Sequence, residues 1–443
     1  MGIEIKHALA LNAFDGAKRT AMDAATRALL NRRKRNFGAA SVLFYRAPLN
    51  IVRAEGVWMI AADGRRYLDA YNNVPSVGHS HKRVAEAIAA QSTAVNTSTR
   101  YLNDIIETYA ERLKATLPKS LSNVVLTCSG SEANDLALRL AAQASGGQGF
   151  VVTETAYHGN TLAVTDISPS ARKPGTSVRH VKTVPAPGRA AYGADIAGGF
   201  AKAVNKAIAV LKRDGLRPAA LICDTIFSSD GVFADPPGFM AQAVAAMRAA
   251  GGLFIADEVQ PGFGRTGERF WGFARHRLTP DIVTMGKPMG NGYPMAGLAT
   301  RPALLAAYCA EVGYFNTFAG NPVAAAAGLV VLDVIRDEGL QANARTIGAD
   351  LRARLAALAQ RHAVIGEVRG AGLFIGVEFS HDGDLARPDP ETASRVIDGM
   401  RERGVLIGAA GRYGNILKIR PPLCFAEAHV DFFVKALAQV LKN

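Results

Sequence analysis

The sequence is poor in cysteine, with four in 443 residues and no CxxC pair. Cysteines this far apart are typical of reduced thiols rather than of a disulfide scaffold. Long apolar runs are also missing, because charged residues interrupt them well before the length of a membrane-spanning helix. Charges at Glu4 and Lys6 interrupt the first residues, which therefore lack the core of a signal peptide. We expect a cytoplasmic protein without a transmembrane helix.

Acidic residues are fewer than basic ones, at 38 against 51, which gives a formal net charge of +13. Such a charge fits either a nucleic-acid surface or a protein that attracts anionic substrates and cofactors. The one basic cluster, Arg-Arg-Lys-Arg at 32–35, has no aromatic residues between its charges and matches no recognition motif. We therefore expect a small anionic ligand and no nucleic-acid or membrane partner.

Strand and helix patterns alternate through the middle of the chain, which predicts an α/β architecture with a mainly parallel sheet. We predict strands at 122–127, 149–153, 219–224 and 251–257, and helices at 82–95, 103–116, 196–213 and 236–250. Before them we predict a helix at 16–35 and a hairpin over 51–69 that turns at 62–64. A C-terminal domain follows, with helices at 340–361 and 391–403, strands at 365–369, 372–379 and 415–420, and a terminal helix.

One lysine stands out because of the residues around it. Lys287 follows the β-branched pair Ile282 and Val283, and the helix breakers Gly286 and Pro288 flank it. This pattern predicts an irregular turn at the end of a strand. A lysine amine with a lowered pKa is a nucleophile and can form a Schiff base. In isolation, however, a lysine in such a loop is more often an ordinary surface residue.

The run at 251–260 changes that interpretation. It has the pattern of a buried strand that ends in Asp257, 30 residues before Lys287. Ligands of α/β sheets bind beyond the carboxyl ends of the strands, so two strands can direct a carboxylate and an amine at one ligand. The cofactor that needs both is pyridoxal 5′-phosphate (PLP), with lysine on its aldehyde and aspartate on its pyridinium nitrogen.

Other loops carry weaker signals. The small residues at 128–131 enter a predicted helix whose N-terminus suits a phosphate, although serine is also an ordinary capping residue there. Tyr157 is either suited to stack on a flat ring or is simply packed. His79 and His81 resemble a metal-binding pair, but no carboxylate is close in sequence, so we predict loop packing and no metal.

Residues 262–267 match the dinucleotide pattern GxGxxG. They do not directly follow a strand, and the next residues, Glu-Arg-Phe-Trp-Gly-Phe, do not predict an amphipathic helix. The structural context that gives this pattern its meaning is therefore missing, and we set NAD aside.

Taken together, these stretches resemble the class III (ornithine/ω-type) aminotransferases of PLP fold type I, from about Arg46 to the C-terminus. The resemblance implies a large domain with a mainly parallel seven-stranded sheet and a smaller α+β domain. It places the large PLP-binding domain at 71–330 and the small domain at 331–443, which the N-terminal segment 1–70 joins.

The resemblance also implies roles for single residues. Lys287 is the Schiff-base lysine, and Asp257 holds the pyridinium nitrogen protonated. The remaining implied cofactor-binding residues are Gly130 and Ser131 at the phosphate, Tyr157 and Val259 on the two ring faces, Gln260 near the phenolic oxygen, and His158. Thr317 would reach the phosphate bound by a partner subunit, so the expected active unit is a homodimer.

The sequence departs from most members of the family at the substrate side. Lys418 stands where an arginine usually grips a carboxylate, and Ser229 stands where a glutamate usually pairs with that arginine. Because lysine lacks the bidentate fork, an ordinary α-carboxylate site is disfavoured. Phe227 replaces a glutamine of many relatives, and Asp224 replaces a glutamate.

The most similar subgroup is that of the ethanolamine-phosphate phospho-lyases and alanine–glyoxylate aminotransferase 2-like enzymes. It is similar at 96–102, 131–140, 314–318 and 417–425. We predict β-elimination from an aminoalkyl phosphate such as ethanolamine phosphate, with Arg100, Lys418 and Arg420 on the substrate anion. An alternative for Arg420 is that it points to solvent. The alternative functions are an amine:2-oxo-acid transaminase and, more distantly, a non-catalytic or nucleic-acid-binding protein.

Overall fold

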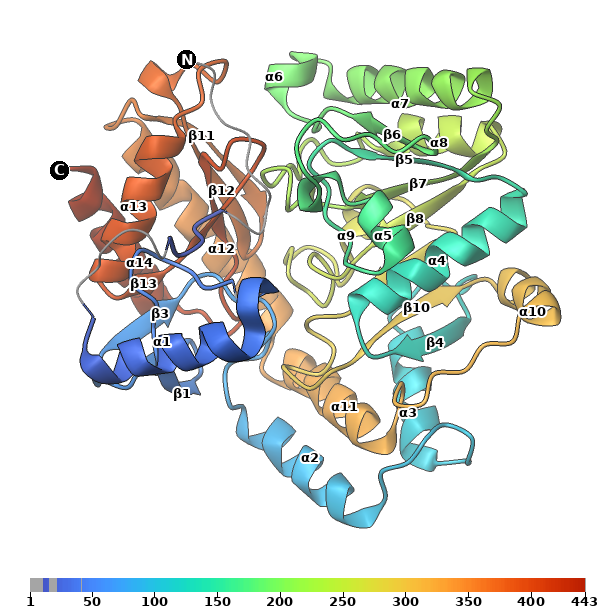
Figure 1. Ribbon diagram of the computed structural model, residues 1–443, viewed down its shortest axis with the longest axis horizontal. Helices are drawn as coiled ribbons and strands as arrows, with labels where there is room; N and C mark the ends of the chain where they lie inside the picture. The colour runs from blue at the N-terminus through green and yellow to red at the C-terminus, as the bar shows by residue number, and fades with distance from the viewer. Residues whose placement is uncertain (1–10, 16–21, 41, 443) are drawn as a thin grey trace.

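The computed structural model describes residues 11–15, 22–40 and 42–442. Its central feature, on the right of Figure 1, is a seven-stranded sheet in the order β4-β10-β9-β8-β7-β5-β6. The strands are β4 (Asn123–Thr127), β5 (Gly149–Thr153), β6 (Val181–Val184), β7 (Pro218–Asp224), β8 (Leu253–Asp257), β9 (Ile282–Met285) and β10 (Ala296–Thr300). Only β10 runs antiparallel to its neighbours. The predicted α/β fold with a mainly parallel sheet is confirmed.

Each face of this sheet packs into its own hydrophobic core, because successive strand residues point to opposite faces. Leu221 and Phe254 lie in one core, and Ile222 and Ile255 lie in the other. The first core is covered by α7 (Ile196–Arg213) and α8 (Ala241–Ala249), and the second by α4 (Gly130–Ser145). Burial of both faces explains why these strands have apolar runs without alternation.

The C-terminal part of the chain, on the left of Figure 1, has an antiparallel sheet in the order β11-β12-β15-β14. Its strands are β11 (Ile365–Ala371), β12 (Phe374–Phe379), β14 (Gly408–Ala410) and β15 (Ile416–Ile419). Its helices are α12 (Leu340–Ala359), α13 (Pro390–Glu402) and α14 (Glu427–Leu441).

The N-terminal part joins this region through a third sheet in the order β1-β2-β3-β13. Its strands are β1 (Ile51–Glu55), β2 (Trp58–Ala61), β3 (Arg66–Asp69) and β13 (Val405–Leu406). The parallel pairing of β3 with β13 brings the two ends of the sequence together, as the proposed joining of segment 1–70 requires. The domain boundaries at 70 and 330 remain a prediction.

The remaining helices are α1 (Ala24–Phe37), α2 (Lys82–Ala94), α3 (Asp104–Lys114), α5 (Leu162–Asp166), α6 (Arg189–Tyr192), α9 (Gly272–Arg275), α10 (Pro302–Glu311) and α11 (Pro322–Asp337). Helix α11 packs against α2 and α3, at the lower edge of Figure 1. Among the described residues, no helix combines the length and the apolar character that crossing a membrane requires.

Several predicted elements differ from the structure. The predicted hairpin is a three-stranded meander, because Gly56 adopts a positive φ of 57° and turns the chain before Trp58. The stretch 165–195, which reads as loop, contains the edge strand β6. The sequence also did not predict β10 and α10. Part of the predicted helix at 16–35 lies outside the described residues, and α1 begins after its cap Asp23.

Candidate active site

The carboxyl ends of three neighbouring strands meet at one edge of the large sheet. Asp224 at the end of β7 is the registered neighbour of Asp257 at the end of β8, and Asp257 is the neighbour of Thr284 in β9. Lys287 is the second residue after β9. The structure therefore brings together the carboxylate and the amine whose pairing the sequence predicted.

Both oxygens of Asp257 are anchored in a buried position. Oδ2 accepts from Asn134 Nδ2 at 3.0 Å and lies 2.7 Å from His158 Nδ1, and Oδ1 accepts from the Val259 amide at 3.0 Å. Thr284 fixes Asn134 in turn, donating its hydroxyl to Asn134 Oδ1 at 2.6 Å. The carboxylate is thus held in one orientation by three partners, from α4, from the loop after β5 and from the segment after β8.

The neighbouring acid, Glu258, points elsewhere. It is fully buried and accepts from the Thr225 hydroxyl at 2.7 Å and from the Gly272 and Phe273 amides at 2.7 and 2.8 Å. Burial raises its pKa to about 7. Glu258 therefore supports the turn at α9 and is not available to a ligand beside Lys287.

Lys287 is half-buried in a turn in which Met289 donates its amide to the Gly286 carbonyl at 2.7 Å. Burial and the positive charge of Arg420 lower the pKa of Lys287 to about 8, against the opposing effect of Asp257 and Asp224. A lysine amine with such a pKa is partly neutral near physiological pH, which nucleophilic attack on a carbonyl requires.

The start of α4 forms a narrow cradle beside this amine. A Cβ on Gly130 would lie 3.0 Å from a Val259 methyl, and a Cβ on Gly159 would lie 2.4 Å from Ser131 Oγ. Ser131 Oγ also accepts from the Asn160 amide at 3.2 Å. Only glycines fit these two close approaches.

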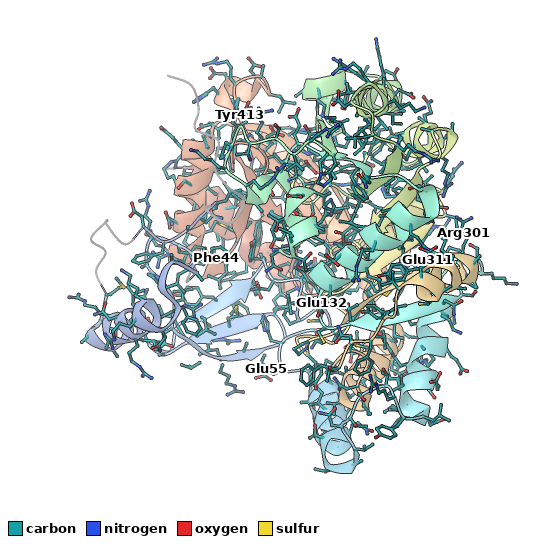
Figure 2. The ribbon with its side chains drawn as sticks, turned by 45° about the vertical axis from the view of Figure 1, so that its right-hand side comes forward. Phe44, Glu55, Glu132, Arg301, Glu311 and Tyr413 are labelled. Atoms are coloured by element: carbon teal, nitrogen blue, oxygen red, sulfur yellow. The ribbon has the colours of Figure 1, made fainter. Side chains whose placement is uncertain are left out.

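That same helix start carries a capping box. Ser129 caps α4, and Glu132, labelled in Figure 2, accepts from the amides of Cys128 and Ser129 at 2.8 Å. The first amides of a helix have no partner within the helix, so those of Gly130 and Ser131 suit a phosphate.

Tyr157 is half-buried on the loop after β5, next to His158, and burial raises the pKa of its phenol. Val259 is buried on the segment after β8. The sheet edge therefore supplies an aromatic ring, an apolar side chain, an anchored carboxylate, a reactive amine and free amides. These residues fit PLP, because the cofactor has a flat ring, a basic nitrogen, an aldehyde and a phosphate.

Arg420 joins the C-terminal sheet to this edge. It is buried, with an exposed fraction of 7%. Its Nη1 donates to Asn73 Oδ1 at 2.8 Å and to Gln260 Oε1. The alternative that Arg420 points to solvent is wrong, because Lys418 and Arg420 are two residues apart and so share one face of the strand.

Gln260 continues this chain of hydrogen bonds. Its Nε2 donates to Ser228 Oγ at 2.5 Å, and Ser228 Oγ donates to Asp224 Oδ2. The chain thus runs from Asn73 and Arg420 through Gln260 and Ser228 to Asp224. Gln260 was predicted to lie near the phenolic oxygen of the cofactor. Its side-chain nitrogen and oxygen both form hydrogen bonds within the protein.

Lys418 lies in β15 between Gly376 and Gly408 on the neighbouring strands, which leaves its side chain space to extend. It is buried, and its Nζ lies 5.8 Å from the Phe374 ring centroid. Among the described residues, no carboxylate oxygen lies within 4.0 Å of this Nζ. Burial and the charges of Arg420 and Lys287 hold the pKa of Lys418 well below its usual value.

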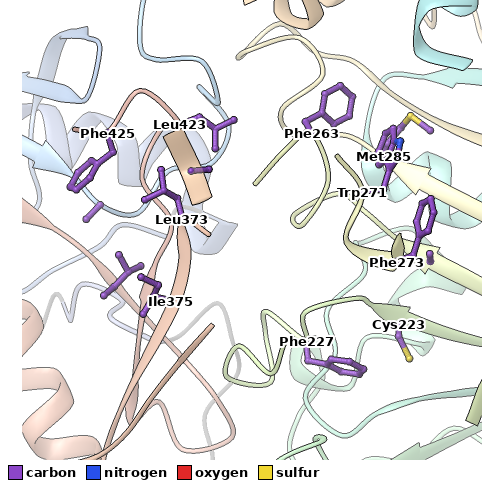
Figure 3. Close-up of a cluster of buried hydrophobic side chains, with 14 of the residues drawn as sticks. Cys223, Phe227, Phe263, Trp271, Phe273, Met285, Leu373, Ile375, Leu423 and Phe425 are labelled. Carbon is purple, nitrogen blue, oxygen red and sulfur yellow. The ribbon is translucent and has the colours of Figure 1, made fainter. Parts of the chain in front are cut away.

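The loop after β7 explains why no acid pairs with Lys418. Asp224 turns back on its own loop, where it accepts from the Ile226 and Ser228 amides, each at 3.1 Å. Phe227 adopts a positive φ of 51° and packs against Phe200 and Phe239 in the core, where Figure 3 shows it beside Cys223.

Asp224 and Phe227 fix the start of this loop, and Ser229 and Asp230 continue it. Ser229 lies at the mouth of a cavity beside Gly411, and its carbonyl accepts from the Gly411 amide at 3.0 Å. The next residue, Asp230, is buried and accepts from Thr153 and Thr155 at 2.8 and 2.5 Å. Burial raises the pKa of Asp230 to about 6.

Two predicted site residues lie elsewhere within one chain. Arg100 is exposed between α2 and α3, with its guanidinium carbon 4.1 Å above the Phe315 ring. Thr317 is exposed on the same α10–α11 loop as Phe315. The structure of a single chain brings Arg100 next to the loop of Thr317, not next to Lys418 and Arg420.

The two histidines of the predicted loop each contact a carboxylate. His79 Nε2 lies 2.7 Å from Asp69 Oδ2, and His81 Nε2 lies 3.0 Å from Glu338 Oε1. Each histidine thus contacts a different acid, and within the described ranges no group of three metal-binding side chains occurs. The expectation that no carboxylate lies close was wrong for both histidines, because Asp69 is 10 residues from His79 and Glu338 is 257 residues from His81.

Sequence reasoning missed five residues that shape this site: Asn73, Asn134, Ser228, Asp230 and Thr284. All are polar, and only Ser228 and Asp230 adjoin a residue that the sequence analysis singled out on the substrate side, Ser229. Buried polar groups must find partners, so a buried asparagine such as Asn134 in the apolar face of a helix was the available signal.

Comparison with known proteins gives consistent relatives. A family model described as "Aminotransferase class-III" matches residues 42–441. The chain is 40% identical over 416 residues to alanine–glyoxylate aminotransferase 2 homolog 2, mitochondrial, of Arabidopsis thaliana, covering 92% of this chain and 86% of that protein. It is 37% identical over 437 residues to ethanolamine-phosphate phospho-lyase homolog 1 of Caenorhabditis elegans, covering 93% of each.

The solved structures agree with these relatives. A phospholyase from Arthrobacter, solved in complex with phosphoethanolamine, matches with a TM-score of 0.90 at 42% identity, covering 94% of this chain and 99% of that one. A Bacillus anthracis aminotransferase matches with a TM-score of 0.83 at 26% identity, covering 95% and 100%.

Proposed function

This chain belongs to the class III aminotransferase family of PLP-dependent enzymes, and we propose that it is a phospho-lyase acting on a small aminoalkyl phosphate. The family, the fold type and the cofactor predicted from the sequence are confirmed by these relatives. The substrate class and the reaction go beyond the family and are argued below from this chain's own residues.

The observation that carries the proposal is the buried amine of Lys418, which has no carboxylate at ion-pair distance among the described residues. In a buried position, a lysine normally has an acid partner or loses its proton. Here Asp224 is tied to its own loop, and a serine at position 229 offers no charge. A substrate phosphate would supply the missing negative charge. The similarity to a phospholyase that binds phosphoethanolamine supports the same substrate class.

The proposed cofactor-binding residues follow from the cradle described above. The first amides of α4 and Ser131 would hold the phosphate, Tyr157 and Val259 would flank the ring, and Asp257 would face the ring nitrogen. When bound, PLP supplies an aldehyde that condenses with amines and a ring that withdraws electrons from Cα. His158 and Asn134 keep the Asp257 carboxylate oriented toward that ring through their bonds to Oδ2.

Lys287 Nζ is the proposed base. Its lowered pKa and its place at the turn after β9 let it accept the Cα proton once a substrate amine has taken its position. The Cβ–O bond then breaks, and phosphate leaves with the bonding electrons while a double bond forms between Cα and Cβ. Water hydrolyses this unsaturated amine, so the products are an aldehyde, ammonia and phosphate.

A second candidate is an amine:2-oxo-acid transaminase. It is favoured by the similarity to proteins named alanine–glyoxylate aminotransferase 2, at 40% and 34% identity. A transaminase would return the amino group to a 2-oxo acid and release no phosphate, which separates it from the lyase.

A homodimer is part of the proposal. Arg100, Phe315 and Thr317 lie on one exposed surface, and Leu102 and Phe318 on the same two segments are 97% and 73% exposed. Large exposed apolar side chains in one area indicate a protein interface. Across such an interface Thr317 and Arg100 would reach the partner's site, which explains why one chain alone does not bring them to Lys287.

The experiment is a paired assay of the holoenzyme. With phosphoethanolamine alone, we expect phosphate and ammonia to appear in equal amounts. With an amine donor and pyruvate or glyoxylate, we expect little alanine or glycine. Amino-acid formation without phosphate release would reject the lyase and support the transaminase.

A further inference from the structure

A second cationic cavity lies beside the proposed reaction site. It has a volume of about 300 Å³, near the lower end for small-molecule sites. It is lined by residues after the end of β5 and in the edge strand β6, and by Gly411 and Arg412, which directly precede Tyr413, labelled in Figure 2. Its wall includes three cationic side chains, those of Arg172, Lys173 and Arg412.

The positive charges of this cavity exceed its negative charges. Arg412 Nη1 forms an ion pair with Glu154 Oε2 at 2.7 Å, so these two charges offset each other. Arg172 and Lys173 have no acid partner in the part of the chain that the structure describes. The Arg172 Nε is buried and has no hydrogen-bond partner. A buried guanidinium nitrogen without a partner costs free energy unless a ligand or water supplies an acceptor.

One buried acid, Asp230, is linked both to the cavity and to Lys418. Thr155, which lines the cavity, donates its hydroxyl to Asp230 Oδ1 at 2.5 Å. Asp230 is also one of the two carboxylates whose charge acts on Lys418. The cavity therefore adjoins the reaction site at the same carboxyl edge of the sheet, where ligands of such sheets bind.

We propose that this cavity is an oxyanion site that holds a phosphate group through Arg172 and Lys173. A planar guanidinium next to an ammonium matches the several acceptor oxygens of a phosphate. Two sources of the phosphate share this chemistry, the free ion and the head group of an incoming phosphorylated amine. Phosphate binding at the cavity is independent of the reaction type, whereas the kinetic test of its source rests on the proposed lyase function.

The test is a calorimetric titration with inorganic phosphate of holoenzyme that carries Lys418→Met, so that the phosphate contact proposed at the reaction site does not contribute. In the double variant Arg172→Gln/Lys173→Gln, we expect the affinity to fall about tenfold or more, because two charge-assisted contacts are lost. The matched control is Lys202→Gln/Lys206→Gln, which removes the same charge from the exposed face of α7 and should leave the affinity unchanged. An equal loss in both variants, or no loss in the first, overturns the proposal.

The Lys418→Met background itself separates this cavity from the reaction site. Lys418→Met removes the proposed substrate contact, and phosphate should still bind to that holoenzyme. Phosphate binding that disappears with Lys418→Met places the ion at the reaction site and overturns the proposal, while leaving the proposed function intact.

Steady-state kinetics identify the source of the phosphate. If the cavity takes the substrate's head group, Arg172→Gln/Lys173→Gln raises the KM for phosphoethanolamine and leaves kcat unchanged. If it takes the free ion, the same variant weakens product inhibition by phosphate and leaves KM unchanged. If neither constant changes, the cavity has no such role.

Discussion

Binding of a phosphate at Lys418 should be accompanied by proton uptake. In the free site, burial and the charges of Arg420 and Lys287 hold the pKa of Lys418 well below its usual value. An anion beside Nζ favours the charged form, so the pKa rises on binding. At a pH between the lowered and the raised value, the lysine is neutral before binding and protonated afterwards. At a pH below both values the lysine is already charged, and the uptake vanishes.

The size of the contact follows from its type. A hydrogen bond to a charged group contributes about 1.5–3 kcal/mol, and each 1.36 kcal/mol is about a factor of ten. Lys418→Met keeps the length and apolar stem of the side chain, so packing against Phe374 is retained. We expect kcat/KM for phosphoethanolamine to fall about 10- to 100-fold, with unchanged absorbance of the bound cofactor.

The proton itself is measured by calorimetry in two buffers that differ in ionisation enthalpy. The wild-type holoenzyme should take up a fraction of a proton per phosphate bound. The Lys418→Met variant should lack the part of this uptake that comes from Lys418. Lys418→Arg is the matched control, because arginine stays charged at every accessible pH and should bind the anion without uptake. Equal uptake in the wild type and in Lys418→Met would refute the assignment of the anion to Lys418.

Three other predictions test the remaining site residues. Lys287→Ala should abolish turnover while PLP still binds non-covalently, which loss of the borohydride-sensitive absorbance would reveal; wild-type activity would reject the assignment. Asp257→Asn should lower kcat by several orders of magnitude, because a neutral partner no longer favours a protonated ring nitrogen, and an unchanged rate would move that role to another residue. Ser229→Glu should reduce phosphate release about tenfold or more, because the new carboxylate competes with the substrate for Lys418; an unaffected KM for phosphoethanolamine would contradict this.

Residues that act through local sequence were predictable. Lys287 and Asp257 each follow an apolar strand, and the strand ends of a parallel sheet share one edge, so two short runs placed both groups. The boundaries of α7 were predicted to the residue, because its apolar face repeats along the whole helix. The strand β6 was missed because an edge strand of four residues among prolines and glycines has little pattern.

Contacts between distant segments were not predictable. Arg420 meets Asn73, 347 residues away, and Gln260, 160 residues away. His81 meets Glu338 across 257 residues. Patterns along the chain carry no information on such pairs, so the sequence left solvent open as an alternative for Arg420 and suggested no acid for the histidines. The chemical type of each residue could be used to predict its role, but its contact partner could not be predicted from the sequence.

The loop 224–231 shows how one shorter side chain, aspartate at position 224 in place of the glutamate of many relatives, alters the charge balance of a site. An aspartate at 224 is short enough for its oxygens to accept from amides only two and four residues ahead, which closes the loop on itself. That closure turns Phe227 into the core and leaves Ser229 at the cavity mouth. Within the described ranges, no acid then faces Lys418 at ion-pair distance, and the protonated lysine depends on a ligand for its counter-charge. Asp224, Phe227, Ser229 and Lys418 therefore form one arrangement, and its chemistry favours an anionic substrate over an internal ion pair.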